Sequence, residues 1–115
     1  MLIMRTLLVI VLLAGAYVLG QNTSHRRIKL ENMRVGVSEI DYAPGVPRER
    51  SVRPTDEVIV FLDDCRYQRT DPATGEKTVR ERKSGDVIWH DKGEDAPVLV
   101  NVGDKTYRTL LIEMK

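Results

Sequence analysis

The stretch Val58–Arg82, VIVFLDDCRYQRTDPATGEKTVRER, predicts that this chain folds as an all-β domain. It begins with an unbroken apolar run, Val58–Leu62, which is short and β-branched, as is typical of a strand buried on both faces. Two strand-like runs follow, Cys65–Thr70 and Lys77–Arg82. They flank the turn Asp71–Gly75, where proline presets φ and glycine supplies a positive φ. We therefore expect these two runs to pair as a hairpin.

Similar short runs of β-branched and aromatic residues continue on both sides, separated by turn residues. Residues 34–42 and 86–90 are expected to be strands, and residues 97–101 and 106–114 are expected to form a last hairpin. Strands this short have no independent stability, so they must close on one another as a barrel or sandwich. The apolar positions within them give the candidate core: Val35, Val37, Val58, Val60, Leu62, Val87, Trp89, Val98, Val100, Leu110 and Ile112.

The N-terminal segment has the pattern of a secretory signal peptide. A short cationic opening ending at Arg5 precedes the apolar run Thr6–Leu13, and small residues such as Ala16 and Gly20 follow. Cleavage after Ala16 or Gly20 makes residues 1–20 the signal, 21–27 a linker and 28–115 the domain. The alternative is an uncleaved anchor in which residues 6–20 hold the chain to the membrane. Either way we expect an exported protein, periplasmic or secreted, or else anchored to the membrane.

Charge and cysteine content narrow the classes of partner. The chain has 18 Lys and Arg against 17 Asp and Glu, and residues 1–20 contain one basic residue and no acid, so the mature domain is formally neutral. Interleaved charges without a basic stripe make nucleic acid an improbable partner. Cys65 is the only cysteine, which rules out an internal disulfide. It is interpreted as a small apolar residue at a strand end, with a reactive thiol or a dimer bridge as the alternative.

Two stretches carry a family likeness. In the first, five residues separate Gly45 from Ser51, one separates Ser51 from Arg53, three separate Arg53 from Glu57, and six separate Glu57 from Asp64. This spacing resembles the first motif of the cupin superfamily. Gly45 and Glu57 match that motif, Ser51 and Arg53 replace its two histidines, and Asp64 replaces its last glycine.

The second stretch is GDVIWHDKG, residues 85–93, which resembles the second cupin motif. Its two terminal glycines match, Asp91 stands where proline is usual, and Ala96 falls where the third histidine would be. Asn101 lies one residue beyond the usual asparagine. The resemblance implies a single small cupin-like barrel, a double-stranded β-helix or jelly roll, over residues 28–115.

These departures bear directly on metal binding. Enzymes of the family hold a divalent metal with three imidazoles and a carboxylate, and only Glu57 remains of that set. Arg53 has no lone pair to give, Ser51 is a weak neutral donor, and Ala96 offers no ligand. We therefore expect no metal and no other cofactor. Strand parity places Arg53 and Glu57 on one face, so we expect them to share a partly buried ion pair.

The candidate ligand-binding residues at the barrel mouth are Ser51, Arg53, Glu57, Trp89 and Asp95. Trp89 is also among the core candidates, because an aromatic residue of a small barrel can either stack on a ligand or fill the core.

No catalytic residue is assigned. The chain is interpreted as an exported, metal-free binding or structural module of the cell envelope, whose partner is an unidentified small molecule or another envelope protein, with a homodimer left open. The alternative is a small cupin-type enzyme, like an isomerase or a metal-dependent oxygenase, that uses Glu57 or His90.

Overall fold

The computed structural model describes residues 25–115, so the predicted signal or anchor segment lies outside the described residues. The described residues form an all-β domain, as predicted, with eleven strands and no helix. None of their segments is a helix of the length and apolarity needed to span a membrane. The strands are β1 (His25–Glu31), β2 (Val35–Tyr42), β3 (Pro47–Arg48), β4 (Ser51–Val52), β5 (Asp56–Phe61), β6 (Cys65–Thr70), β7 (Lys77–Arg82), β8 (Val87–His90), β9 (Asp95–Ala96), β10 (Val98–Asn101) and β11 (Tyr107–Met114).

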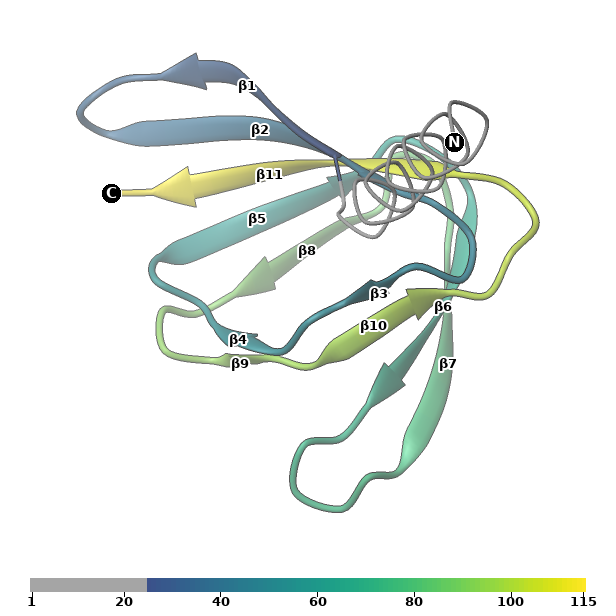
Figure 1. Cartoon of the computed structure of the whole chain (residues 1–115). Coiled ribbons are helices and arrows are strands. Elements are labelled where there is room, and N and C mark those ends of the chain that lie inside the picture. Colours follow the sequence, from purple (N-terminus) through teal and green to yellow (C-terminus); the bar gives the residue numbers. More distant parts are fainter. Residues whose placement is uncertain (1–24) are drawn as a thin grey trace, which may run out of the picture.

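Two antiparallel sheets and a short ribbon enclose the interior (Figure 1). The first sheet has the order β1-β2-β11-β5-β8, the second has the order β3-β10-β6-β7, and β4 pairs with β9. The central strand β11 pairs with β2 along its whole length and with β5 over six residues. Neighbours in the sheets are mostly distant in sequence, as expected of a jelly roll.

The hairpin predicted from the opening stretch is confirmed residue by residue. Cys65 pairs with Arg82 at one end of β6–β7 and Thr70 pairs with Lys77 at the other. The side chain of Asp71 accepts hydrogen bonds from two backbone N–H groups in the turn, and Gly75 has a φ of 74°. Local turn chemistry is therefore enough to set this hairpin.

The predicted last hairpin is wrong. β10 pairs with β3 and β6, whereas β11 lies in the other sheet between β2 and β5. The loop between them therefore crosses from one sheet to the other. Asn101 holds this crossing, because its amide donates to the carbonyls of Tyr42 and Lys105 and its side-chain oxygen accepts from the N–H of Gly103, each at 2.8 Å.

Strand β1 begins at His25, so the last three residues of the predicted linker already pair with β2. All seven residues of β1 are exposed, and β1 lies at the edge of the five-stranded sheet. Among the described residues its outer side has no strand partner.

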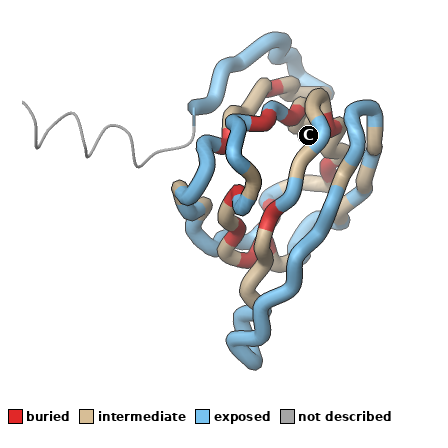
Figure 2. Tube along the Cα trace, turned by 90° about the vertical axis from the view of Figure 1, so that its right-hand side faces the viewer, coloured by how far each residue is buried: buried red, intermediate tan, exposed pale blue. Residues whose placement is uncertain are grey.

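The predicted core is wrong in its choice of face. The buried cluster consists of Tyr42, Phe61, Tyr67, Leu99 and Tyr107, and none of the eleven candidate positions is fully buried. In β5 the residues that line the interior alternate with the valines that had been chosen, so these valines lie on the outer face. Figure 2 marks the buried residues in red along the Cα trace of the barrel.

The reason is that the interior is partly polar. Ser38, Arg53, Glu57, Asn101 and Thr109 are all buried there. Choosing the β-branched positions as the core therefore selected the opposite face, where Val87 is 61% exposed.

Candidate functional site

Four positions singled out by motif spacing meet at one cavity. Ser51 and Ala96 are direct partners across β4–β9, and Arg53 and Glu57 follow on the same wall. All four line a cavity of about 280 Å³ in the barrel interior. The structure thus brings Ser51, Arg53 and Glu57 together as predicted, with Ala96 beside them.

Backbone pairing beyond the ends of the short strands fixes Arg53 at this place. Its N–H donates to the carbonyl of Glu94, and its carbonyl accepts from the N–H of Gly93, both at 2.9 Å. Gly93 adopts a φ of 87°, a left-handed conformation that residues with a Cβ rarely adopt. This turn therefore presents its backbone to Arg53, whose side chain then lies inside the barrel.

The expected ion pair between Arg53 and Glu57 is confirmed. Arg53 Nη1 donates to Glu57 Oε1, and the two residues are only 7% and 3% exposed. A charge at this depth is costly unless it is paired, so each side chain neutralises the other. Glu57 is consequently engaged and is not available as an isolated base.

This donor set does not fit a divalent metal. A guanidinium donates to the one remaining carboxylate, and the other two positions carry a hydroxyl and a methyl group. Within residues 25–115, no three His, Cys, Asp or Glu side chains are grouped as a metal site would need.

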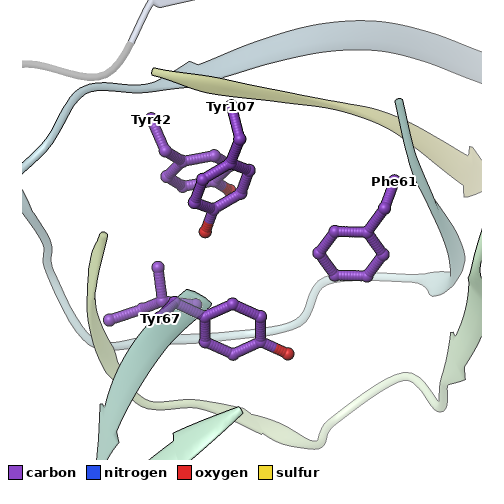
Figure 3. Close-up of a cluster of buried hydrophobic side chains, with 5 residues drawn as sticks. Tyr42, Phe61, Tyr67 and Tyr107 are labelled. Carbon is purple, nitrogen blue, oxygen red and sulfur yellow. The ribbon is translucent and has the colours of Figure 1, made fainter. Parts of the chain in front are cut away.

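A second cavity of about 70 Å³ lies against the aromatic cluster. The rings of Tyr42 and Tyr107 stack with centroids 4.9 Å apart, and Phe61 lies 6.1 Å from Tyr67 (Figure 3). The two cavities share five lining residues, which are Tyr42, Arg48, Arg53, Ile59 and Thr109. They are therefore neighbouring parts of one interior.

Sequence reasoning missed most of this second region. Tyr107 alternates along β11 with the residues that had been assigned to the core, and Thr109 and Leu111 share its face. Arg48 reaches the interior from the short strand β3, which no apolar pattern marks. Tyr107, Thr109 and Leu111 would have been found only by assigning the more polar face of β11 to the interior.

The hydroxyl of Tyr107 is buried without a hydrogen-bond partner in the described residues, and the residue is only 2% exposed. In Figure 3 this hydroxyl points away from its strand into the space between the rings. Burial raises the pKa of Tyr107 well above its ordinary value. The group therefore remains a protonated donor at any physiological pH.

His90 also faces the interior, since it lines the smaller cavity and pairs with Glu57 in the β5–β8 ladder. Its Nδ1 lies 2.9 Å from Glu94 Oε2. The hydrogen bond from His90 lowers the pKa of Glu94. An imidazole oriented by a carboxylate has the arrangement that acid–base catalysis uses.

Two of the predicted site residues do not reach the interior, and their assignment is corrected. Trp89 is 52% exposed on the outer face of β8, and its Nε1 donates to Asp91. Asp95 alternates with Ala96 on β9, and it accepts from Arg50 at 2.7 Å outside the two cavities. Both follow from strand parity, because their neighbours His90 and Ala96 occupy the inner face.

No protein-family model matches the chain, and a search of curated proteins gives no match. Solved structures do match. A cupin domain from Bordetella pertussis superposes with a TM-score of 0.71 at 20% identity, over 80% of this chain and 93% of that one. The chain has the cupin fold.

Two further solved structures share this fold with the chain. A cupin superfamily protein from Desulfitobacterium hafniense matches with a TM-score of 0.57 at 16% identity, over 81% of this chain and 78% of that one. The polyketide cyclase RemF from Streptomyces resistomycificus matches with a TM-score of 0.64 at 18% identity, over 79% of this chain and 64% of that one. At these identities the cupin likeness establishes architecture, and function has to be argued from the site.

Proposed function

We propose that this cupin-fold chain is a metal-free binding module that takes a small molecule into its barrel. The supporting observation is the Arg53–Glu57 ion pair, which lies where the cupin pattern has metal ligands and borders a cavity of about 280 Å³. The small side chains of Ser51 and Ala96 leave room on the same wall. A concave cavity that combines apolar side chains with fixed polar groups is typical of a small-molecule site.

Two measurements on the purified full-length chain test this function. After dialysis, metal analysis should find no stoichiometric Fe, Mn or Zn, and addition of these ions should leave the melting temperature unchanged. A fragment library should contain compounds that raise the melting temperature, because a ligand that binds only the folded state stabilises it. Stoichiometric metal, or a library without any stabilising compound, would contradict the proposal.

A pair of matched variants ties this binding to the cavity. Ala96→Leu places extra bulk on the inner face and should abolish the fragment-induced shift. Val52→Leu changes the neighbouring strand β4 on its exposed side and should leave the shift intact. Equal responses of the two variants would place the binding elsewhere.

We propose further that the module is exported, which rests on the signal-like pattern of residues 1–20. Intact mass measurement of the protein recovered from outside the cytoplasm tests this. Loss of residues 1–16 or 1–20 supports a cleaved signal, whereas a species that retains Met1 supports the anchor. Recovery only from the cytoplasm would contradict export.

A second candidate function is acid–base catalysis, and His90 is the observation that favours it. Its ring lines the smaller cavity and is oriented by Glu94, whereas Glu57 is engaged by Arg53. His90→Gln separates the two functions. A binding module keeps its affinity in this variant and turns nothing over, whereas an enzyme loses turnover of whatever compound it converts.

A homodimer through the sheet edge is also proposed. Within residues 25–115, strand β1 presents an unpaired edge with two exposed apolar side chains, Ile28 and Leu30. Such an edge is a template for strand pairing with a second copy or with another envelope protein. Light scattering should find a dimer that Ile28→Glu with Leu30→Glu converts to a monomer. A monomeric parent chain would overturn the homodimer.

A further inference from the structure

The smaller cavity has an unusual charge balance. Four arginines line it, namely Arg48, Arg53, Arg69 and Arg82, and no carboxylate does. Of these four, only Arg53 forms an ion pair within residues 25–115. The wall therefore has an excess of positive charge in a partly enclosed site, where electrostatic attraction is stronger than in open water.

Two of these guanidinium groups are held in place and still have a buried, unpartnered N–H. Arg48 Nη2 donates to the carbonyl of Pro97 at 2.6 Å, and Arg53 Nη1 donates to Glu57. The Nε atoms of both arginines are buried and lack a hydrogen-bond partner in the described residues, as does the hydroxyl of Tyr107. A buried donor without a partner costs free energy, so three of them on residues that line the smaller cavity point to an acceptor that binds there.

The larger cavity indicates the chemistry of the rest of such a ligand. The larger cavity, which shares Arg48 and Arg53 with the smaller one, has Ile40, Ile59 and Leu111 in its wall. Its two carboxylates are both neutralised, Glu57 by Arg53 and Glu113 by Arg26. An apolar body is therefore accommodated next to an anionic head without a repelling charge.

We propose that the barrel binds a small monocarboxylic acid with a flat or branched apolar body. Its carboxylate accepts hydrogen bonds from the Nε–H groups of Arg48 and Arg53 and from the hydroxyl of Tyr107, and its body fills the larger cavity. This assignment rests on the proposed binding function and adds the chemical class of the ligand. Arginine suits this role, because its planar group donates to carboxylate oxygens in a fixed geometry.

Calorimetric titration of the full-length chain with benzoate and with its neutral isostere benzamide tests the ligand class. Benzoate should bind at one site per chain, and benzamide should bind at least about tenfold more weakly, as expected when hydrogen bonds to a charged group are lost. Equal affinities would overturn the carboxylate assignment. Inorganic phosphate provides a second arm, and binding of phosphate with no preference for benzoate would also overturn it.

Two variants test whether the carboxylate of the ligand binds at Arg48. Arg48→Met should weaken benzoate about tenfold or more. The matched control is Arg50→Met, which removes an exposed arginine paired with Asp95 on the outside and should leave affinity unchanged. If Arg48→Met binds benzoate with the affinity of the parent chain, the ligand carboxylate does not bind at Arg48 and the proposed site is wrong.

Tyr107→Phe is expected to affect stability and affinity differently, and it tests the proposal even if Arg48→Met does not fold. Removing a buried hydroxyl that has no partner should leave the free protein at least as stable, whereas the affinity for benzoate should fall. A variant that is destabilised and keeps its affinity contradicts the assignment. Neutral fragments that bind when benzoate does not would overturn the ligand class alone, and a complete absence of binding would overturn the proposed function as well.

Discussion

Arg53 and Glu57 neutralise each other inside the barrel, at positions where the cupin pattern has a histidine and a glutamate that hold a metal. Arg53 follows the end of β4, Glu57 is the second residue of β5, and both residues line the larger cavity. The guanidinium supplies the positive charge that neutralises Glu57, and the small side chains of Ser51 and Ala96 leave space beside the pair.

A double-mutant cycle measures this ion pair. Arg53→Met or Glu57→Gln alone should lower the free energy of unfolding by about 3 kcal/mol or more, because each leaves a buried group uncompensated. The double variant should be more stable than either single variant. The exposed pair Arg66 and Glu81, at 3.2 Å, is the matched control and should be additive within about 0.5 kcal/mol. Additivity at Arg53 and Glu57 as well would show that the pair is not coupled.

A second prediction concerns Asn101, which is buried and makes three hydrogen bonds at the crossing between the sheets. Asn101→Ala should lower the free energy of unfolding by about 2–4 kcal/mol, since it leaves buried backbone groups unpaired. Asn32 is the control, because its side chain accepts from Arg34 and Val35 in an exposed turn. Chemical denaturation should show a much smaller loss for Asn32→Ala, and equal losses would contradict the special role of Asn101.

The reactivity of Cys65 is a third prediction. Burial raises the pKa of the Cys65 thiol to about 11. Only the thiolate reacts, so alkylation by iodoacetamide at pH 8 should be roughly 100-fold slower in the folded chain than in the same chain unfolded in urea. The rate in the folded chain should keep rising up to about pH 11. Similar rates in both states at pH 8 would favour the reactive thiol that the sequence left open.

Acid stability follows from two surface carboxylates. The Arg27 guanidinium lowers the pKa of Asp41, and the Arg108 guanidinium lowers that of Asp63. A carboxyl with a folded pKa below its unfolded value stabilises the fold above the unfolded pKa, and this contribution is lost as the pH falls through the folded value. Unfolding measured below about pH 4 should therefore be less pH-dependent in Asp41→Asn and Asp63→Asn than in the parent.

The control for acid stability is Asp104→Asn, because Asp104 forms no ion pair within the described part of the chain. Its acid profile should follow that of the parent. Both ion pairs are partly exposed to solvent, so the differences should shrink further in high salt. A profile of Asp41→Asn identical to that of the parent would contradict the linkage.

A fifth prediction restores metal binding. Ser51, Arg53 and Ala96 line one cavity with Glu57, so replacing all three by histidine supplies three imidazoles and a carboxylate. The triple variant should bind Ni²⁺ or Zn²⁺ at one ion per chain and melt at a higher temperature with metal than without. Ser51→His with Ala96→His, which keeps Arg53, should bind far more weakly. A folded triple variant without stoichiometric metal would show that these positions do not converge as a ligand set.

The features that the sequence predicted correctly are those that local chemistry determines. The turn at Asp71–Gly75 carries its own hydrogen bonds, so the pairing of β6 with β7 could be predicted from the residues of the turn. The meeting of Ser51, Arg53 and Glu57 was predictable because motif spacing encodes it. Fold class followed from the repeated strand and turn pattern.

The features that failed depend on distant partners. Nothing in residues 97–114 shows that β10 and β11 belong to different sheets, since that depends on β2, β5 and β6. Trp89 and Asp95 were assigned to the mouth from residue type, and strand parity puts them outside. The arginine-lined cavity was missed because Arg48 lies on a two-residue strand with no pattern of its own.

The outward-facing valines of β5 have a consequence for folding. Because the inner face of β5 also carries Ile59 and Phe61, sliding this strand by one residue would exchange one apolar set for another, and hydrophobic burial alone would distinguish the two alignments only weakly. The misaligned state would also move Glu57 to the outer face and leave Arg53 buried without its carboxylate. The ion pair within the barrel thus favours the native register of β5 over a register shifted by one residue, which hydrophobic contacts alone would tolerate.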